Sequence, residues 1–457
     1  MIGIRKIFGF SSTKKIIKES SIYTFTNLIN SAAGFLILPI LTRYLTPEDY
    51  GIVTTFQIIR SFGVLFVGMG TIDAIIRAFY EKEKDNSKFN DYMSNAIIVI
   101  VSLFICITIL IFTFSRVIEK FFPFPAIWLL LVPIVSIASV LANIVLKLWI
   151  VKHKAVQYAA FNISQTFFEI LLSVIFVILF GLAWKGRLLG IAITESVVLL
   201  MGILLIGREH SFKRSVNSIN YDSMKKILNY GIPVFFHSLG FWAIGSTDRF
   251  FLNKMVGLSA TGIYSTGCSL SSIIGFLAGS FGMAWTPVFY EKLSNPTYEN
   301  KVKIVKFTYL YYLGFSLLGI LIILLSPYLV RIMLGKSFYG SIQFISWLVP
   351  GYVFFAMYRM VCGYIFYSKK TYIMMRITLS SAVVNLILNY VLIKINGAVG
   401  AAQAVFFTYM VSFFLTWWFG QKLFPMPWFS FLKAPIHSVE TPRLERRDES
   451  RLPTGQA

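Results

Sequence analysis

Long apolar segments separated by short polar ones fill the chain from about residue 20 to residue 422. A helix needs roughly 20 apolar residues to cross the hydrocarbon core of a bilayer, and the loops between these segments are too short for a soluble domain. The pattern therefore predicts an all-α polytopic membrane protein. Its twelve transmembrane helices are expected at about 20–42, 51–78, 91–115, 125–148, 157–182, 188–207, 226–252, 259–286, 303–329, 339–366, 372–394 and 398–422.

Part of this pattern occurs twice. The decapeptide TRYLTPEDYG ends at Gly51 and precedes a long apolar helix that ends in FYEK at 79–82. The decapeptide NKMVGLSATG ends at Gly262 and precedes another that ends in FYEK at 289–292. A repeat of this length is a duplicated half-protein and not a short solenoid unit. Further equivalent positions are Lys154 and Lys370, Glu169 and Asn385, and Gly190 and Gly400.

The duplication predicts two lobes. Six helices per half is an even number, so both halves enter the membrane with the same orientation and form parallel repeats. We expect a basic cytoplasmic N-terminus at 1–18, an N-terminal lobe at 19–210, a C-terminal lobe at 211–425 and a disordered cytoplasmic tail at 426–457.

Composition supports a membrane protein, and the distribution of charge orients it. Of the 457 residues 56% are hydrophobic and 14% are charged, with a mean hydropathy of +0.72, which is too apolar for the surface of a soluble domain of this size. With the N-terminus inside, thirty of the 42 Lys and Arg fall in cytoplasmic segments and ten in outer ones. Cytoplasmic loops carry such an excess, so both termini are predicted to be cytoplasmic.

The net charge of +22 then reflects topology and contact with anionic membrane lipid, and no nucleic-acid partner is expected. The three cysteines lie in apolar runs without a CxxC or Cys/His cluster, so neither a disulfide nor a metal site is expected. Walker A, nucleophile-elbow and HExxH sequences are absent, which argues against an enzyme and against a cofactor. Transport would then be driven by an ion gradient or by removal of the product.

Polar side chains share one face on several predicted helices. Asn27 and Asn30 do so on the first helix, and Gln57 lies on the polar face of the second. Such residues can be interhelical glue, each bond contributing less than about 2 kcal/mol. Several stripes extend over four or more turns, beyond the length of one helix crossing. We therefore favour a shared aqueous cavity between the halves.

Two arginines, Arg60 and Arg359, lie well inside predicted spans, where each costs roughly 2.5–3.5 kcal/mol on insertion. One explanation is an ion pair with Glu169 or Asp248. The other is an anion site that receives one guanidinium from each half. Glu169 and Asp248 are also the candidate groups for coupling to protons or sodium, because both are carboxylates in predicted spans.

Three stretches resemble a known family: TRYLTPEDYG, Asp248–Arg249 at the end of the seventh helix, and Gly262–Tyr264 at the start of the eighth. Together they resemble the Wzx-type oligosaccharide flippases of the MOP exporter superfamily, to which the MATE drug exporters also belong. The resemblance covers about residues 15–425. It implies a MATE-like transporter with two lobes around a central cavity, in the bacterial cytoplasmic membrane.

The resemblance also implies a function. Members of this family flip polyprenyl-diphosphate-linked oligosaccharides to the outer leaflet for O-antigen, capsule or exopolysaccharide, and implied partners are a polysaccharide polymerase and a chain-length regulator. A guanidinium binds phosphate oxygens in bidentate fashion, which suits such a substrate. The candidate substrate-binding residues are Arg60, Arg249, Arg359, Gln57, Asn27 and Asn30.

Two alternatives stay open. A MATE-like exporter of small cationic drugs should have an acidic cavity, whereas arginines and carboxylates are mixed in these spans. A membrane glycosyltransferase or polymerase would need a large catalytic loop, and the loops of this chain are short.

Overall fold

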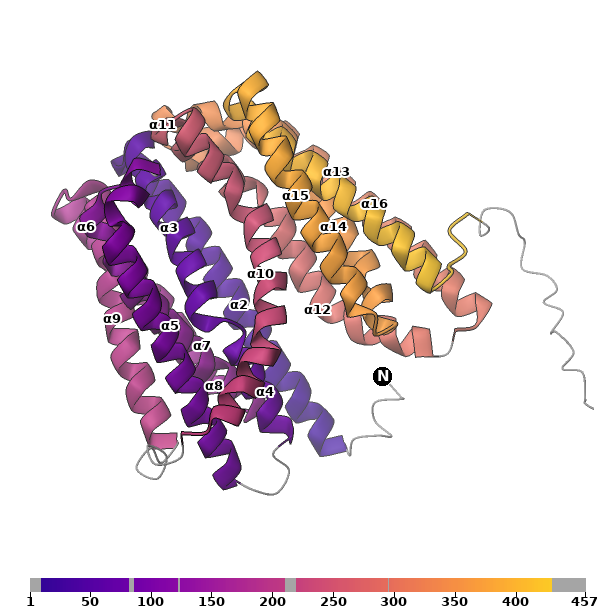
Figure 1. Cartoon of the computed structure of the whole chain (residues 1–457). Helices are drawn as coiled ribbons and strands as arrows, with labels where there is room; N and C mark the ends of the chain where they lie inside the picture. Colours follow the sequence, from indigo (N-terminus) through magenta and orange to yellow (C-terminus); the bar gives the residue numbers. More distant parts are fainter. Residues whose placement is uncertain (1–9, 82–85, 122–123, 210–218, 295, 430–457) are drawn as a thin grey trace, which may run out of the picture.

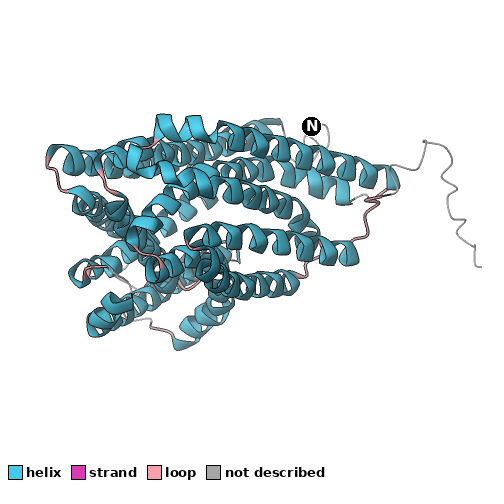
Figure 2. Cartoon of the chain, turned by 90° about the horizontal axis from the view of Figure 1, so that it is seen from above, coloured by secondary structure: helices cyan, strands magenta, loops and turns pink. Residues whose placement is uncertain are grey.

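The computed structural model describes residues 10–81, 86–121, 124–209, 219–294 and 296–429, and every regular element in these ranges is a helix (Figure 1; Figure 2). Twelve helical segments are long and apolar enough to cross a bilayer, which confirms the predicted fold class. The elements are α2 Phe10–Tyr44, α3 Pro47–Gly68, α4 Thr71–Glu81, α5 Asn86–Phe121, α6 Ala126–Leu129, α7 Leu131–Val151, α8 Ala155–Val174, the π-helical η1 Ile175–Leu179, α9 Ala183–Glu209, α10 Tyr221–Met255, α11 Leu258–Ser271, α12 Ile273–Ser294, α13 Tyr298–Met333, the 3₁₀ helix η3 Lys336–Ser341, α14 Ile342–Tyr367, α15 Thr371–Asn396 and α16 Ala398–Leu423.

The second predicted span, 51–78, is interrupted in the structure. Met69 and Gly70 separate α3 from α4 with left-handed φ angles of 34° and 70°, a conformation that glycine adopts without a steric penalty. A Cβ on Gly70 would come within 2.6 Å of the carbonyl oxygen of Gly231 in α10. The span therefore ends with α3, and the break lets the backbone approach α10.

The helices form two bundles, which Figure 1 shows side by side. Helices α2 to α9 make the first bundle and α11 to α16 the second. Helix α10 packs on α3, α4 and α5 of the first and on α15 and α16 of the second, so it connects the two. The bundles meet where α3 and α11 begin and diverge toward the opposite end (Figure 1).

The predicted terminal regions fall partly outside the described residues. Residues 1–9 and 430–457 are not described, while the remainder of the predicted basic N-terminus continues into α2. Beyond α16, Trp428 is buried and donates its Nε1–H to Gln421 Oε1 at 2.8 Å. The packed chain therefore continues past residue 425.

The repeated decapeptide determines where α3 begins. Thr46 Oγ1 accepts a hydrogen bond from the Asp49 N–H at 3.1 Å, and Asp49 Oδ2 accepts one from the Thr46 N–H at 3.0 Å. This capping box is followed by Pro47 in the first helical turn, where the missing N–H costs no hydrogen bond. The sequence TPED thus fixes the start of the helix that carries Gly51.

The two copies of the repeat contact each other through their backbones. A Cβ on Gly51 would overlap the carbonyl oxygen of Leu258, and one on Gly262 would overlap that of Pro47. Leu258 lies four residues before Gly262, and Pro47 lies four before Gly51. The contact is therefore reciprocal, as about a local two-fold axis, and only glycine fits at its centre.

A second backbone contact closes the same end of the molecule. The N–H of Gly335 donates to Thr42 Oγ1 at 3.1 Å, and a Cβ on Gly335 would overlap the Thr42 carbonyl. Next to it, Arg43 Nη2 donates to the carbonyl oxygen of Ile332 at 3.0 Å. The lobes are thus joined here by α2 and α13 as well as by α3 and α11.

We predict that Gly51→Ala and Gly262→Ala destabilise the protein in detergent, because a carbonyl oxygen in a helix cannot move away from the added Cβ. Alanine otherwise favours a helix over glycine by about 1 kcal/mol. The matched controls are Gly34→Ala and Gly279→Ala, since nothing lies within 4 Å of a Cβ at either position. The midpoint of thermal unfolding should fall only for Gly51→Ala and Gly262→Ala. Equal shifts in all four variants would contradict the contact.

Candidate functional site

A polar pocket of about 250 Å³ lies between the lobes, where α3 faces α10 and α11. We call it the inter-lobe pocket. Its wall consists mainly of hydroxyl and amide groups around one charged side chain, and two predicted site residues, Gln57 and Arg249, meet in it. The lining residues are Tyr50, Thr54, Gln57, Ile58 and Ser61 of α3, Ser246 and Arg249 of α10, and Ser265 and Ser269 of α11.

The Arg249 guanidinium is anchored on one side and keeps donors for the pocket. Its Nη1 donates to the carbonyl oxygen of Gly245 at 2.7 Å and lies 3.6 Å from Oδ1 of Asp248. A guanidinium carries five N–H donors in a planar fork, and the side chain remains 19% exposed. Arg249 can therefore bind an anion without giving up its anchor.

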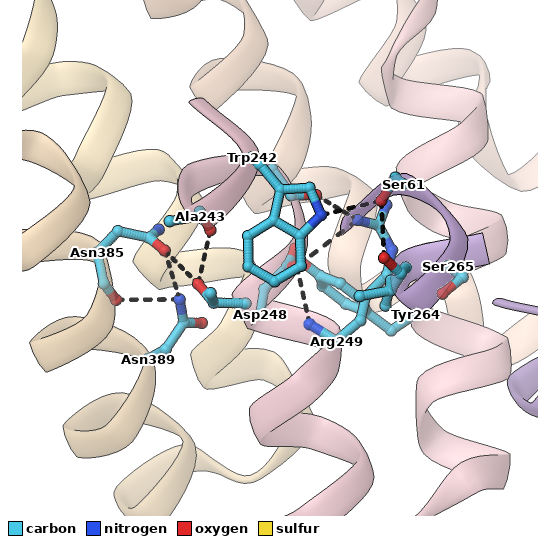
Figure 3. Close-up of polar contacts among 12 residues, drawn as sticks. Ser61, Trp242, Ala243, Asp248, Arg249, Tyr264, Ser265, Asn385 and Asn389 are labelled. Atoms are coloured by element: carbon cyan, nitrogen blue, oxygen red, sulfur yellow. Dashed lines mark hydrogen bonds and ion pairs between the residues drawn. The ribbon is translucent and has the colours of Figure 1, made fainter. Parts of the chain in front are cut away.

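Asp248, by contrast, turns into the C-terminal lobe. Its side chain is 4% exposed. Oδ2 accepts from Tyr264 Oη at 2.6 Å, and Oδ1 accepts from the backbone N–H of Arg249 at 2.8 Å. Figure 3 shows this cluster together with the bond from Trp242 Nε1 to Ser61 Oγ, 2.9 Å long, which crosses from α10 to α3.

The two asparagines of the first helix lie in an adjoining pocket of about 570 Å³, which shares Ser269 with the inter-lobe pocket. Asn27 Oδ1 accepts from Tyr158 Oη at 3.0 Å, and Asn30 Nδ2 donates to Asn162 Oδ1 at 2.7 Å. Both side chains are thus oriented by α8 while they line the pocket.

Arg359 lies in a separate, aromatic pocket of about 340 Å³ in the C-terminal lobe. Its guanidinium carbon is 5.9 Å from the ring centre of Phe355, and no carboxylate forms an ion pair with it among the described residues. The pocket walls are mostly rings, among them Phe241, Trp285, Phe289, Tyr311, Phe355 and Tyr358.

Arg60 does not lie in any of these pockets. It forms an ion pair with Glu195 of α9, and its Nη2 also donates to Ser139 Oγ at 3.1 Å. The expected partner was Glu169 or Asp248, and neither is bonded to it. Sequence reasoning missed Glu195, although a lone carboxylate in the apolar run LLGIAITESVVLLMGILLIG was a visible signal.

Glu169 has a different partner, Arg187. The two form an ion pair at 2.7 Å, and Arg187 Nη1 also donates to Ser173 Oγ at 2.6 Å. Arg187 falls between the predicted spans 157–182 and 188–207, but its side chain is only 8% exposed and it lies in the first turns of α9. It is therefore a structural neighbour of α8.

The pockets differ from the lobe interiors in the sign of their charge. The charged residues that line the pockets described above, and a further pocket between α4, α5 and α10, are all basic: Arg77, Lys226, Arg249 and Arg359. The intramembrane carboxylates Glu169, Glu195 and Asp248 are each engaged inside a lobe. In the described part of the chain, no three His, Cys, Asp or Glu side chains are grouped so that they could hold a metal ion.

The sequence is similar to proteins of polysaccharide assembly. The family model described as polysaccharide biosynthesis protein matches residues 16–292, and the MatE model matches residues 233–391. A Staphylococcus aureus protein, "Capsular polysaccharide biosynthesis protein CapF", is 23% identical over 421 residues, which cover 90% of this chain and all of that protein. The Haemophilus influenzae "Lsg locus putative protein 1" is 24% identical over 81% of this chain and 89% of its own length.

The fold is similar to solved transporters. A lipid II flippase, MurJ, in an inward closed conformation has a TM-score of 0.68 at 15% identity over 88% of this chain and 87% of its own. A multidrug MATE transporter of the MOP superfamily has a TM-score of 0.67 in an inward-facing structure and 0.58 in an outward-facing one, with 15% and 16% identity. The first covers 87% of this chain and 94% of its own, and the second 88% and 92%. These likenesses confirm the MATE-like architecture.

We predict that Glu169 and Arg187 are energetically coupled. Arg187→Met should lower the free energy of unfolding by about 3 kcal/mol, because it leaves a carboxylate without its partner inside the lobe. Adding Glu169→Gln should restore part of that loss. A double-mutant cycle measured by unfolding in detergent checks this. If the losses in free energy of unfolding were additive, the two side chains would have no mutual interaction energy.

Proposed function

The chain belongs to the polysaccharide biosynthesis protein family within the MOP superfamily, and on that premise we propose that it is a Wzx-type flippase of the bacterial cytoplasmic membrane. It translocates polyprenyl-diphosphate-linked oligosaccharides from the cytoplasmic to the outer leaflet by alternating access and catalyses no chemical reaction. The names of the Staphylococcus aureus relative and of the lipid II flippase support a lipid-linked substrate of this kind.

The observation that carries this proposal is the basic lining of the pockets. A diphosphate carries two negative charges, and a guanidinium in a poorly hydrated site binds phosphate oxygens in bidentate fashion. Arg249 presents such a group among hydroxyls between the two lobes, and Arg359 presents another among aromatic rings. Hydroxyl, amide and aromatic surfaces next to a cation are also what a sugar with a diphosphate requires.

A MATE-like multidrug exporter is the second candidate, because the fold is shared with such transporters. The aromatic pocket could take a flat organic molecule. A cationic drug would need an accessible carboxylate, however, and Glu169, Glu195 and Asp248 already bind groups inside the lobes. The charge of the pockets thus favours the anionic lipid-linked oligosaccharide.

The excess of Lys and Arg in the predicted cytoplasmic segments assigns a direction to the molecule. On this assignment the end where α3 meets α11 faces outward, and the lobes diverge toward the cytoplasm. The state described is then inward-facing, ready to accept substrate from the inner leaflet. The greater likeness to the inward-facing than to the outward-facing MATE structure supports this. A polymerase and a chain-length regulator would use the product.

We predict a graded loss of function at the two pocket arginines. Arg249→Lys keeps the charge but loses the fork, and Arg249→Ala loses both, so the alanine variant should be worse, and the same order should hold at Arg359. One charged hydrogen-bonding contact is worth about 1.5–3 kcal/mol, or roughly 10- to 150-fold in affinity. Complementation of a flippase-null strain, with surface polysaccharide and membrane protein levels measured, provides the readout.

The control for this series is Arg116→Ala, because Arg116 is exposed and lies outside the pockets. It should leave surface polysaccharide unchanged. Normal polysaccharide in both Ala variants at normal protein level would rule out the anion site.

The orientation is testable by cysteine labelling. In a background without native cysteines, Lys185→Cys and Lys336→Cys should react with an impermeant maleimide on intact cells, after removal of any outer membrane barrier. Arg208→Cys and Glu291→Cys should react only after permeabilisation of the cytoplasmic membrane. All four positions are exposed, so the reversed pattern would mean the opposite orientation.

A further inference from the structure

One carboxylate lies deep in the N-terminal lobe with its hydrogen-bonding capacity only half used. The side chain of Glu195 has no solvent exposure. Its Oε1 binds Arg60 and lies 3.3 Å from Ser139 Oγ and 3.4 Å from Gln165 Nε2. Its Oε2 is buried and has no hydrogen-bond partner among the described residues. Arg60 is therefore the main compensation for the buried charge.

The duplicated half of the protein shows that the fold does not need this cluster. Counted from Gly51 and Gly262 along unbroken helices, Arg60 is equivalent to Ser271. Counted from the paired Lys154 and Lys370, Gln165 is equivalent to Ser381, and counted from Gly190 and Gly400, Glu195 is equivalent to Val405. All three C-terminal counterparts are buried. The same architecture thus forms with neutral residues at these positions.

Arg60 lies on α3 beside residues that line the inter-lobe pocket. Gln57 lies one turn before it on α3 and Ser61 follows it directly, and both line that pocket. The Arg60 side chain is 21% exposed, whereas Glu195 is completely enclosed. A rotation of the long, flexible Arg60 side chain would carry its guanidinium toward the pocket, and the carboxylate cannot follow.

We propose that substrate and proton bind together: a phosphate oxygen of the substrate takes Arg60 from Glu195, and Glu195 then takes up a proton from the solvent. This rests on the proposed function, because the anion is the diphosphate of the lipid-linked oligosaccharide. An ionised carboxylate without a partner is strongly disfavoured in a low-dielectric interior, and protonation removes that cost. The step forms one O–H bond on Glu195 and breaks the bond that held this proton in hydronium or a buffer acid.

Among the described residues around Glu195, no second cation is free to replace Arg60. Helix α9 packs on α3, α7, α8 and η1. Three side chains face Glu195 from these helices: Arg60 from α3, Ser139 from α7 and Gln165 from α8. The residues of η1 are all apolar. The other charged groups nearby are Glu169 of α8 and Arg187 of α9, which bind each other. Loss of Arg60 therefore leaves the Glu195 carboxylate with only the neutral donors of Ser139 and Gln165.

The test is calorimetric titration of the full-length protein in detergent with a short prenyl-diphosphate-linked N-acetylglucosamine. Both phosphates of this probe are esterified, so it does not itself take up protons near neutral pH. Measurements at one pH in PIPES and in imidazole, which differ in ionisation enthalpy, give the number of protons taken up. We expect about one proton per probe, and by linkage a roughly tenfold gain in affinity per unit fall in pH at full coupling.

Two variants of similar shape separate the proposal from a structural role. Glu195→Gln should bind the probe with no proton uptake, and Glu119→Gln, a control at an exposed carboxylate outside the pockets, should take up as many protons as the unmodified protein. Binding without proton uptake in the unmodified protein, or unchanged uptake in Glu195→Gln, would overturn the proposal. The first of these results needs no variant, so a misfolded variant leaves the test intact. Absence of binding to the unmodified protein would instead refute the proposed substrate class.

Discussion

The backbone contact between the two repeat copies is the constraint on which the rest of the structure depends. Lipid tails are as apolar as leucine side chains, so lobes in a bilayer are held by close packing and not by the hydrophobic effect. Gly51 and Gly262 let α3 and α11 approach closely, so that Gly51 faces the carbonyl of Leu258 and Gly262 faces the carbonyl of Pro47. The inter-lobe pocket is lined by residues close to these glycines on the same helices, such as Tyr50, Thr54 and Ser265. The close contact at the two glycines therefore limits the width of the pocket. Separating α3 from α11 at this contact would open the pocket at the end where these two helices begin.

The low dielectric of the membrane interior explains how the charges are arranged. A carboxylate there must be bound by donors or lose its charge, and each intramembrane carboxylate described here sits inside a lobe with such donors. A guanidinium keeps its charge in any environment and tolerates partial hydration. Arg249 and Arg359 can therefore face water-accessible pockets. The result is a scaffold that is internally neutralised and presents positive charge where the substrate would pass.

Apolar periodicity and the repeat were sufficient to predict the twelve helices, because span length is imposed by the bilayer and can be counted along one chain. They could not predict the break at Met69 and Gly70, since GMG in an apolar run is compatible with a continuous helix until α10 packs against it. The partner of Arg60 was missed for a related reason. Helical wheels place a side chain on a face, but which helix lies opposite is decided by tertiary packing. The residue types of the site could therefore be predicted from the sequence, but which side chains bind one another was less predictable.

The divergence of the two halves points to a division of labour. Glu169 and Ser173 bind Arg187 in the first half. Their equivalents in the second half, Asn385 and Asn389, form a neutral network instead. Asn385 accepts from the hydroxyl of Thr247 at 2.8 Å and donates to Thr408 Oγ1 at 3.0 Å, and Asn389 donates to Asn385 at 3.0 Å.

In the second half, amide and hydroxyl groups thus hold together the helices that are equivalent to those held together by charged groups in the first half. Charged clusters cost more to bury than neutral ones, so stability alone gives no reason to keep two of them in one half. In the second half Arg249 and Arg359 face the pockets, and the buried Asp248 is held by the Tyr264 hydroxyl and the backbone N–H of Arg249. A carboxylate in an internal ion pair can take up a proton when its partner is drawn away, and the neutral residues at the equivalent positions of the second half cannot. The two lobes share one fold, and among the described residues only the first has the Arg60–Glu195 cluster on which the proposed exchange of substrate and proton depends.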